Sequence, residues 1–300
     1  MMKQRLMTLA KPVVTPVTKA VLKRHYQNSK ALSELGDVHK VVVVAPHMDD
    51  ETIGAGGTIL KHVARGDEVY CIFTTDGAGS ESGYSREQLS QMRKEEMARV
   101  NEILNMTNIY YMDLPDGNVQ SDADSQKALS SILESISPDV IYCTPFVDAH
   151  PDHVASTHLL ADVLRKTNVF QPIVRLYEIN CPIPPDEINC IIDISDTFDQ
   201  KLEAIAQFNS QVIAFDGFIE LNRLKTNLVP NQQLRAVEGF IELSSDEFVT
   251  QSTQLQNEQE PFHEWFKQAN RTVTLLWAIY KNYPQKKRIY RERLSCNTRE

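Results

Sequence analysis

The chain has 300 residues, of which 42% are hydrophobic and 24% are charged. This length and composition suffice for one large domain with a full hydrophobic core, and they exclude a disordered, collagen-like or coiled-coil protein. Lysines and prolines interrupt the apolar stretches near the N-terminus, so we predict no secretory signal peptide there. No run of about 20 apolar residues occurs, so we expect no membrane-spanning helix.

The net charge of -9 is unevenly distributed. Residues 1–30 contain seven basic and no acidic residues, and residues 281–300 contain seven basic and two acidic ones. This leaves 17 of the 31 basic and 38 of the 40 acidic residues to residues 31–280. Basic ends on an acidic body predict contact with an anionic membrane or a glycosyltransferase partner, although such ends can also pack on the protein itself. We further expect a homo-oligomer and, without a recognised nucleic-acid motif, no nucleic acid.

The cysteines are odd in number and scattered, and they form no C-x-x-C pair. They are Cys71, Cys143, Cys181, Cys190 and Cys296. This pattern argues against a disulfide framework and against a cysteine-based zinc site. We therefore predict reduced cysteines and a cytoplasmic protein, with peripheral membrane contact through the basic ends.

Short β-branched runs alternate with longer amphipathic stretches from residue 38 onward. In chain order we predict a strand at 38–45, a helix at 52–64, a strand at 69–74, a helix at 85–105, a strand at 108–112, a helix at 125–136, a strand at 140–144, a helix at 154–164 and strands at 174–179 and 188–194. The four consecutive valines of the first strand are typical of a strand buried on both faces.

This alternation predicts an α/β protein, with a Rossmann-like, doubly wound, mostly parallel sheet and helices on both faces. In the common strand order 3-2-1-4, the first and fourth strands are neighbours. The segments that follow residues 45 and 144 should therefore face each other across one crevice at the carboxyl edge of the sheet.

Both of these segments are rich in histidine and aspartate. The first reads Pro-His-Met-Asp-Asp-Glu at 46–51, and the second reads His-Pro-Asp-His at 150–153. A catalytic zinc ion takes three histidine or carboxylate ligands and leaves the fourth position to water. Each cluster alone is also compatible with a helix cap or a turn, but the two together predict a metal site with ligands His47, Asp50 and His153.

The remaining polar residues of the clusters suggest catalytic roles. Asp49 can take the proton of a metal-activated water as general base. His150, as an imidazolium, can stabilise an oxyanion and protonate a leaving amine. Asp152 can fix the tautomer of His150.

At these residues the chain resembles the LmbE-like/PIG-L family of zinc-dependent N-acetylglucosaminyl deacetylases. The family motif A-[HP]-P-D-D-E matches 45–51, except that Met48 replaces the usual proline, and the H-P-D-H motif is complete at 150–153. The resemblance implies the same ligands, with Asp49 as base and His150 as electrophilic acid. The ligand types also allow Fe²⁺ in the cell.

Weaker similarities extend over residues 38–245. They are Thr58 after a glycine pair, Arg93 with Glu96, the Leu-Pro-Asp-Gly turn at 114–117, Lys201, and Ser210 with Gln211. The resemblance implies substrate contacts for Arg93 and Asp116. Arg93 can alternatively pair with Glu95 or Glu96 on a helix surface, and Asp116 can simply form the turn. The glycine-containing loop 76–80 should lie by the pocket as a rim or lid, or be a flexible surface loop.

We therefore predict a metal-dependent hydrolase that removes an acetyl group from an N-acetylglucosamine-containing or related amino sugar. Two alternatives stay open, an amidase that acts on a sugar–thiol conjugate and a non-catalytic sugar-binding or scaffold protein. A non-haem Fe²⁺ oxygenase could use similar ligands, but the alternating strands and helices disfavour it. We divide the chain into a basic extension at 1–37, a catalytic domain at 38–245 and a helical, basic extension at 246–300.

Overall fold

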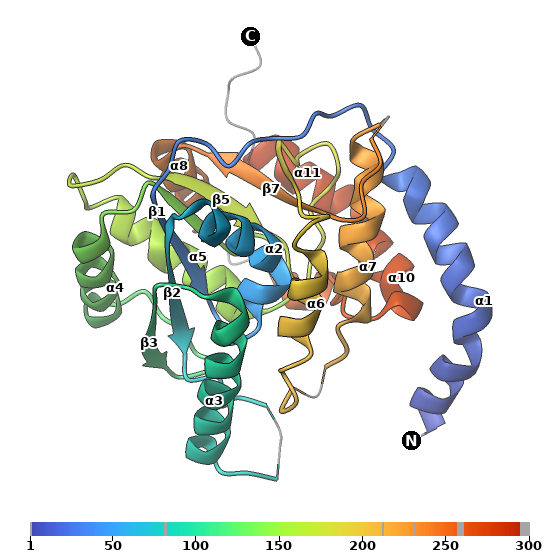
Figure 1. Cartoon of the computed structure of the whole chain (residues 1–300), viewed down its shortest axis with the longest axis horizontal. Helices are drawn as coiled ribbons and strands as arrows, with labels where there is room; N and C mark the ends of the chain where they lie inside the picture. Colours follow the sequence, from blue (N-terminus) through green and yellow to red (C-terminus); the bar gives the residue numbers. More distant parts are fainter. Residues whose placement is uncertain (1, 81–82, 212, 231, 257–260, 295–300) are drawn as a thin grey trace.

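A seven-stranded sheet forms the centre of the computed structural model, which describes residues 2–80, 83–211, 213–230, 232–256 and 261–294 (Figure 1). The strand order is β3-β2-β1-β4-β5-β7-β6, with parallel pairing from β3 to β5 and antiparallel pairing of β7 with both of its neighbours. The strands are β1 (Lys40–Ala45), β2 (Glu68–Thr75), β3 (Asn108–Leu114), β4 (Val140–Cys143), β5 (Ile173–Tyr177), β6 (Cys190–Asp193) and β7 (Val237–Leu243).

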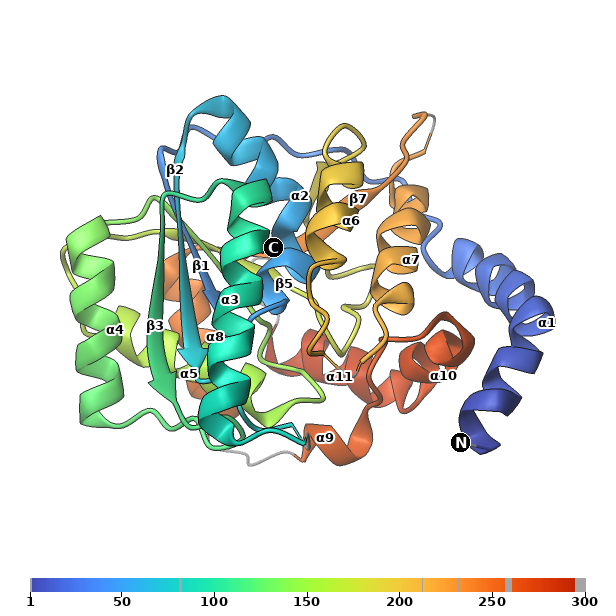
Figure 2. The same cartoon turned by 60° about the horizontal axis from the view of Figure 1, so that its bottom comes forward.

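Helices cover both faces of this sheet. Helices α2, α3 and α6 pack together on one face, and α4, α5 and α8 pack together on the other (Figure 2). The helices are α1 (Met2–His25), α2 (Asp50–Arg65), α3 (Arg86–Leu104), α4 (Ala123–Ile136), α5 (Pro151–Leu164), α6 (Phe198–Ile205), α7 (Asp216–Leu224), α8 (Ser245–Gln256), α9 (Phe262–Trp265), α10 (Leu275–Tyr280) and α11 (Tyr283–Arg293), with short 3-10 turns η1 (Lys225–Leu228) and η2 (Thr272–Thr274).

The predicted fold class and strand order are confirmed. The valines of β1 are fully buried, and β1 lies between β2 and β4, with Val43 opposite Tyr142 of β4. Because β1 and β4 run parallel, their carboxyl ends reach the same edge of the sheet. The loops that carry the two histidine–aspartate clusters therefore begin side by side, as predicted.

The sequence did not reveal β7, which lies between β5 and β6. Its apolar pattern is interrupted by Glu238, Gly239 and Glu242. Glu238 is nevertheless 1% exposed, because it meets a buried lysine on α6. Helix α5 also begins earlier than predicted, at Pro151, so that most of the second cluster forms its first turn.

Both ends of the chain contribute to the core. The N-terminal segment forms α1 despite Pro12 and Pro16, and Leu22 and Tyr26 at its end are fully buried. Phe248, Leu275 and other C-terminal residues join the same hydrophobic cluster. The interpretation that the ends pack on the protein itself is thus confirmed for these parts, while the boundaries at residues 37 and 245 stay a prediction. No helix within the described ranges has both the length and the apolar character needed to cross a bilayer.

A buried ion pair joins α2, α6 and β7. Nζ of Lys201 lies 2.6 Å from Oε1 of Glu238 and donates to the carbonyl of Ile53 (2.7 Å). Glu238 also accepts from the backbone N–H groups of Gly57 and Thr58 (2.9 and 2.8 Å). The pair therefore holds α2 between Ile53 and Thr58, within about two turns of Asp50. Lys201, which was one of the weaker similarities to the PIG-L family, therefore has a structural role in this ion pair.

We predict that Lys201→Met destabilises the fold by about 3–5 kcal/mol, because it leaves the Glu238 carboxylate buried without its counter-charge. Urea unfolding measures the loss. The double variant Lys201→Met/Glu238→Gln removes both charges and should recover part of it. A single variant within about 1 kcal/mol of wild type would show that the pair does not stabilise α2.

Candidate metal centre

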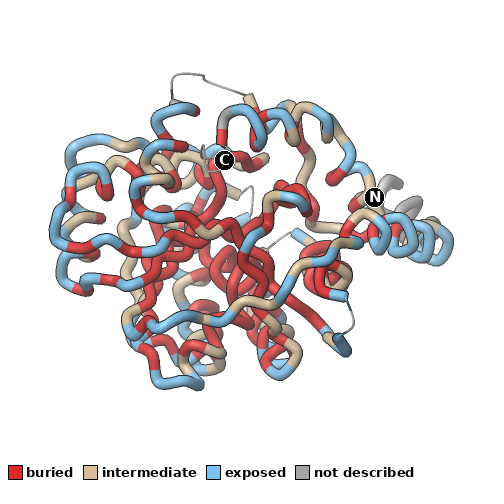
Figure 3. Tube along the Cα trace, turned by 90° about the horizontal axis from the view of Figure 1, so that it is seen from above, coloured by how far each residue is buried: buried red, intermediate tan, exposed pale blue. Residues whose placement is uncertain are grey.

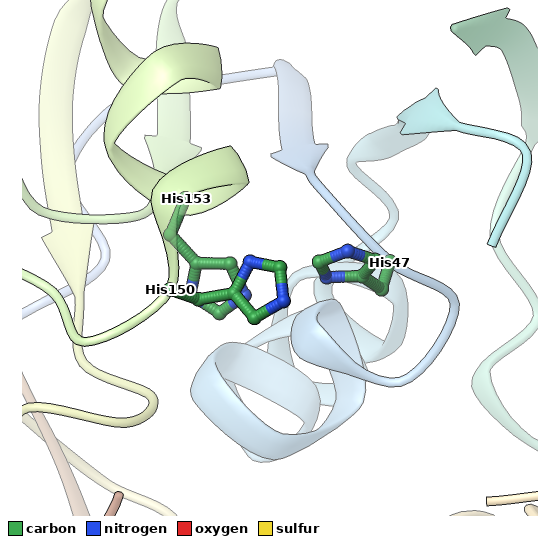
Figure 4. Close-up of side chains that lie close together, drawn as sticks. All are labelled: His47, His150 and His153. Atoms are coloured by element: carbon green, nitrogen blue, oxygen red, sulfur yellow. The ribbon is translucent and has the colours of Figure 1, made fainter. Parts of the chain in front are cut away.

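The two clusters meet across a cavity of about 320 Å³. His47 lies in the loop between β1 and α2, whereas His150 and His153 lie at the start of α5, and the three rings converge on one space (Figure 4). The side chains of the two segments therefore face each other across one cavity, as predicted.

Asp50 lies between two of these histidines. Its Oδ2 is 3.2 Å from Nδ1 of His47 and 3.2 Å from Nε2 of His153. Its carboxylate is 4% exposed. Burial raises the pKa of Asp50, but the two histidines outweigh burial and hold it far below its usual value.

The two distances from Asp50 suit pairs of ligands on one tetrahedral ion. Ligand atoms at 2.0–2.1 Å from zinc lie about 3.3 Å apart at a tetrahedral angle, close to both distances from Asp50. The charges fit as well. Burial lowers the pKa of both histidines, but the surrounding carboxylates outweigh burial and raise the pKa of His153 to about 10 and that of His47 well above its usual value. Such a site attracts a cation, which can be a metal ion in place of these protons.

Two donor sets of three or more residues lie close together in the described residues, and neither contains Asp50. Ligand atoms of His47, His150 and His153 lie within 4.8 Å of one another, as do those of a second set that consists of His47, Asp116, His150 and Asp152. The cluster can therefore bind a metal ion, and the assignment of His47, Asp50 and His153 as the ligands stays a prediction.

Asp49 lines the same cavity and is 4% exposed. Burial and the neighbouring Asp50 carboxylate raise its pKa to about 7. A carboxyl group with this pKa exchanges protons near neutral pH, as a general base requires. Its neighbour Glu51 is fully buried and accepts from the Asp49 N–H (3.2 Å), which fixes the loop.

His150 is the N-cap residue of α5, and its Nδ1 accepts from the backbone N–H of Asp152 at 3.3 Å. Burial and the charges of His153 and His47 lower its pKa to about 4. We expected an imidazolium at this position, whereas these contacts favour a neutral ring that carries its proton on Nε2.

The carboxylate of Asp152 contacts other partners than the His150 ring. It accepts from the N–H groups of Gly117 (2.6 Å) and Val119 (3.3 Å), and it lies 3.4 Å from Nε2 of His47. Asp152 therefore joins the 114–117 turn to the first metal loop, and it contacts His150 through its own backbone N–H.

Asp116 and Arg93 both lie on the cavity wall. Asp116 accepts from the Gly79 N–H (2.7 Å) and lies 3.3 Å from Nε2 of His47. Arg93 is 5% exposed and donates to Oγ of Ser80 (3.0 Å). The alternative of a surface ion pair with Glu96 is not observed, because Arg93 is buried and Glu96 accepts from the N–H groups of Asn209 and Ser210.

The loop 76–80 reaches the cavity through Gly79 and Ser80, so its predicted position beside the pocket is confirmed. Gln211 from the Ser-Gln pair also lines the cavity and donates to the Met48 carbonyl (3.1 Å). A larger groove of about 780 Å³ between α1, α6 and α7 shares Gln211 and Ile213 with the metal cavity.

Asp148, which is 1% exposed, is a site residue that the sequence motifs did not predict. Its Oδ1 lies 3.2 Å from Nδ1 of His153 and accepts from the His150 N–H (2.8 Å), while its other oxygen accepts from the Asn180 N–H (3.1 Å). Carboxylates behind metal-bound histidines orient the ring and raise its basicity. The position of Asp148, two residues before His150, is the signal in the sequence that could have predicted this role.

The fold and this histidine–carboxylate cluster define a mostly parallel α/β protein with a site suited to a divalent metal. Residues 42–164 match the family PIG-L, GlcNAc-PI de-N-acetylase. The matched part of the chain includes both clusters and is similar to the PIG-L family.

Relatives with assigned names support this placement. Diacetylchitobiose deacetylase of Thermococcus kodakarensis is 29% identical over 191 residues, covering 58% of this chain and 71% of that protein. The probable N-acetyl-alpha-D-glucosaminyl L-malate deacetylase 2 of Bacillus cereus is 29% identical over 185 residues, covering 58% and 84%. Among solved structures, N,N'-diacetylchitobiose deacetylase from Pyrococcus horikoshii superposes with a TM-score of 0.59 and 25% identity, covering 77% of this chain and 92% of that one.

We predict that Asp148→Asn weakens zinc binding by about 10- to 100-fold, because the amide cannot stabilise a metal-bound His153 as a carboxylate does. Competition with a chromophoric chelator measures the affinity. Asp37→Asn, at a fully exposed side chain, serves as the control for loss of one negative charge. Equal affinities of the Asp148 variant and wild type would contradict the role of Asp148 behind His153.

Proposed function

We propose that this protein is a zinc-dependent hydrolase that removes an acetyl group from an N-acetylglucosamine-containing or related N-acetyl amino sugar. It would act on a C–N bond other than a peptide bond. The observation that carries the proposal is the contact of Asp50 with both His47 and His153 beside Asp49, inside one cavity. The named deacetylases among the relatives support the same chemistry.

His47, Asp50 and His153 would hold the metal ion. When bound there, zinc would polarise the acetyl carbonyl and lower the pKa of a water molecule to roughly 7. Fe²⁺ in the cell is compatible with the same nitrogen and oxygen donors.

Asp49 would take the proton of the attacking water. Its raised pKa favours this role, because a stronger acid would bind the proton too weakly at neutral pH. The water oxygen bonds to the acetyl carbon, the C–N bond breaks, and the proton passes from Asp49 to the leaving amine, which leaves acetate and a free amino sugar.

His150 would stabilise the oxyanion as a neutral ring. Since its Nδ1 accepts from the Asp152 N–H, the proton lies on Nε2 and can be donated to the developing negative charge. Asp152 holds this arrangement through its bonds to Gly117 and Val119.

Arg93 and Asp116 would contact the hydroxyl groups of the sugar. Both line the cavity next to His47. The Arg93 guanidinium offers hydrogen-bond donors, and the Asp116 carboxylate offers acceptors. Gly117 and Ser80 beside them belong to the loops that shape this end of the cavity.

The cytoplasmic location, the homo-oligomer and the glycosyltransferase partner stay predictions. The amidase alternative shares the proposed residues and differs in the acyl group and the substrate, so only a substrate panel distinguishes it. The non-catalytic alternative is disfavoured because every proposed catalytic position carries a competent side chain.

We predict that Asp49→Asn retains the metal but lowers kcat by about 10²- to 10⁴-fold, the usual contribution of a general base. Amine release from N-acetylglucosamine, diacetylchitobiose and N-acetylglucosaminyl malate is measured together with metal content, with Asp37→Asn as control. Full activity of the Asp49 variant would exclude Asp49 as base. A zinc-loaded wild type that releases no amine from any substrate would favour the binding-protein alternative.

A further inference from the structure

Helix α1 carries a row of exposed valines. Val13, Val17 and Val21 are 71%, 54% and 41% exposed, although valine is usually buried. They are four residues apart, so they follow one another along one side of the helix. Their row lies away from Thr18, Leu22 and Tyr26, which are fully buried against the rest of the protein.

The outer side of α1 is apolar between Pro12 and Val21. Pro12, Pro16 and Ala20 are also exposed and lie among the valines. Figure 3 shows α1 at the edge of the molecule with exposed residues along it. In the described part of the chain, no element covers this face.

The neighbouring helix α10 carries two exposed aromatic residues. Trp277 and Tyr280 of α10 are 55% and 42% exposed, and α10 packs beside α1. The Tyr280 hydroxyl lies 3.1 Å from Nδ1 of His25, the residue one turn after Val21. Tryptophan and tyrosine are the residues that concentrate at membrane–water interfaces, since their rings combine an apolar body with a polar group.

The charged residues of α1 are all basic. The first acidic residue of the chain is Glu34, whereas Lys19, Lys23 and Arg24 lie exposed on the helix. Lys19 pairs with Glu220 at 3.0 Å. Lys23 and Arg24 have no carboxylate within ion-pair distance among the described residues. This local positive charge contrasts with the net charge of -9 of the whole chain.

We propose that the outer face of α1, together with Trp277 and Tyr280, binds the surface of a bilayer that contains anionic lipids. The valines and aromatic rings would enter the headgroup region, and Lys23 and Arg24 would contact the lipid phosphates. A helix with this combination lies in the plane of the interface and does not span the membrane. The contact is independent of the proposed hydrolysis, because none of these residues lines the metal cavity.

A second copy of this chain fits the face less well. In a symmetric dimer through this face, α1 would meet α1 of the other copy, and the charged residues of both helices are all basic. Anionic phosphates instead neutralise these residues, so charge complementarity favours the lipid surface.

Vesicle sedimentation tests this proposal on the full-length protein. We expect it to sediment with phosphatidylcholine–phosphatidylserine vesicles, to bind phosphatidylcholine vesicles far more weakly, and to lose binding as salt is added. Lys23→Glu/Arg24→Glu should reduce binding by about tenfold or more, since each basic residue contributes about 1 kcal/mol.

Val17→Asp should reduce binding as well, because it places a carboxylate at the lipid surface. Val169→Asp is the matched control, since Val169 is 69% exposed outside this face and should bind like wild type. Amine release from a water-soluble substrate should be equal in all these variants, which separates this proposal from the proposed function.

Absence of binding to anionic vesicles would overturn the proposal, as would equal binding by wild type and Val17→Asp. Light scattering adds a further outcome. A wild-type dimer that Val17→Asp dissociates, without vesicle binding, would assign the face to a second copy of the chain and would equally overturn the proposal.

Discussion

The contact of one buried carboxylate with two histidines is the interaction on which the rest of the site depends. Asp50 is at the first position of α2 and lies 3.2 Å from both His47 and His153. The two histidines lie in the segments that follow β1 and β4, so the contact requires that these strands be neighbours and parallel. The four buried valines of β1 secure that arrangement, because a strand so apolar is stable only inside the sheet.

The surrounding residues hold this contact from several sides. Asp148 lies behind His153, and Asp152 connects His47 to the 114–117 turn. Farther out, Lys201 and Glu238 hold α2 at Ile53 and Gly57. Buried carboxylates are costly without compensation, and their concentration here favours bound positive charge. The same low-dielectric surroundings raise the pKa of Asp49 to about 7 and lower that of His150 to about 4. One set of contacts thus supports a base, a neutral hydrogen-bond donor and a metal site together.

The sequence predicted the parts of this structure that local pattern determines. The β1 valines, the alternation of strands and helices and the position of the two clusters all followed from periodicity and from the parallel topology. The strand β7 could not be predicted, since Glu238 becomes a buried residue only through Lys201 on a distant helix. Likewise, α1 contains two prolines and is stabilised by packing that its own sequence does not show.

Roles that depend on contacts were harder to predict than the positions of the motifs. Asp148 carries no motif of its own, and its importance comes from its distance to His153. The protonation of His150 depends on burial and on two neighbouring histidines, so the expected imidazolium is disfavoured. Asp152 was expected at the His150 ring, whereas its carboxylate contacts backbone N–H groups of a turn far away in sequence.

The measurement that tests this account most directly is a crystal structure of the zinc-loaded protein with anomalous data collected at the zinc absorption edge. The account predicts one strong anomalous peak from an ion that His47, Asp50 and His153 bind. His150 should not be bonded to this ion, and Asp49 should lie next to it. A peak bonded instead by His47, His150 and His153, or by the set of Asp116, Asp152, His47 and His150, would contradict the ligand assignment and the roles derived from it.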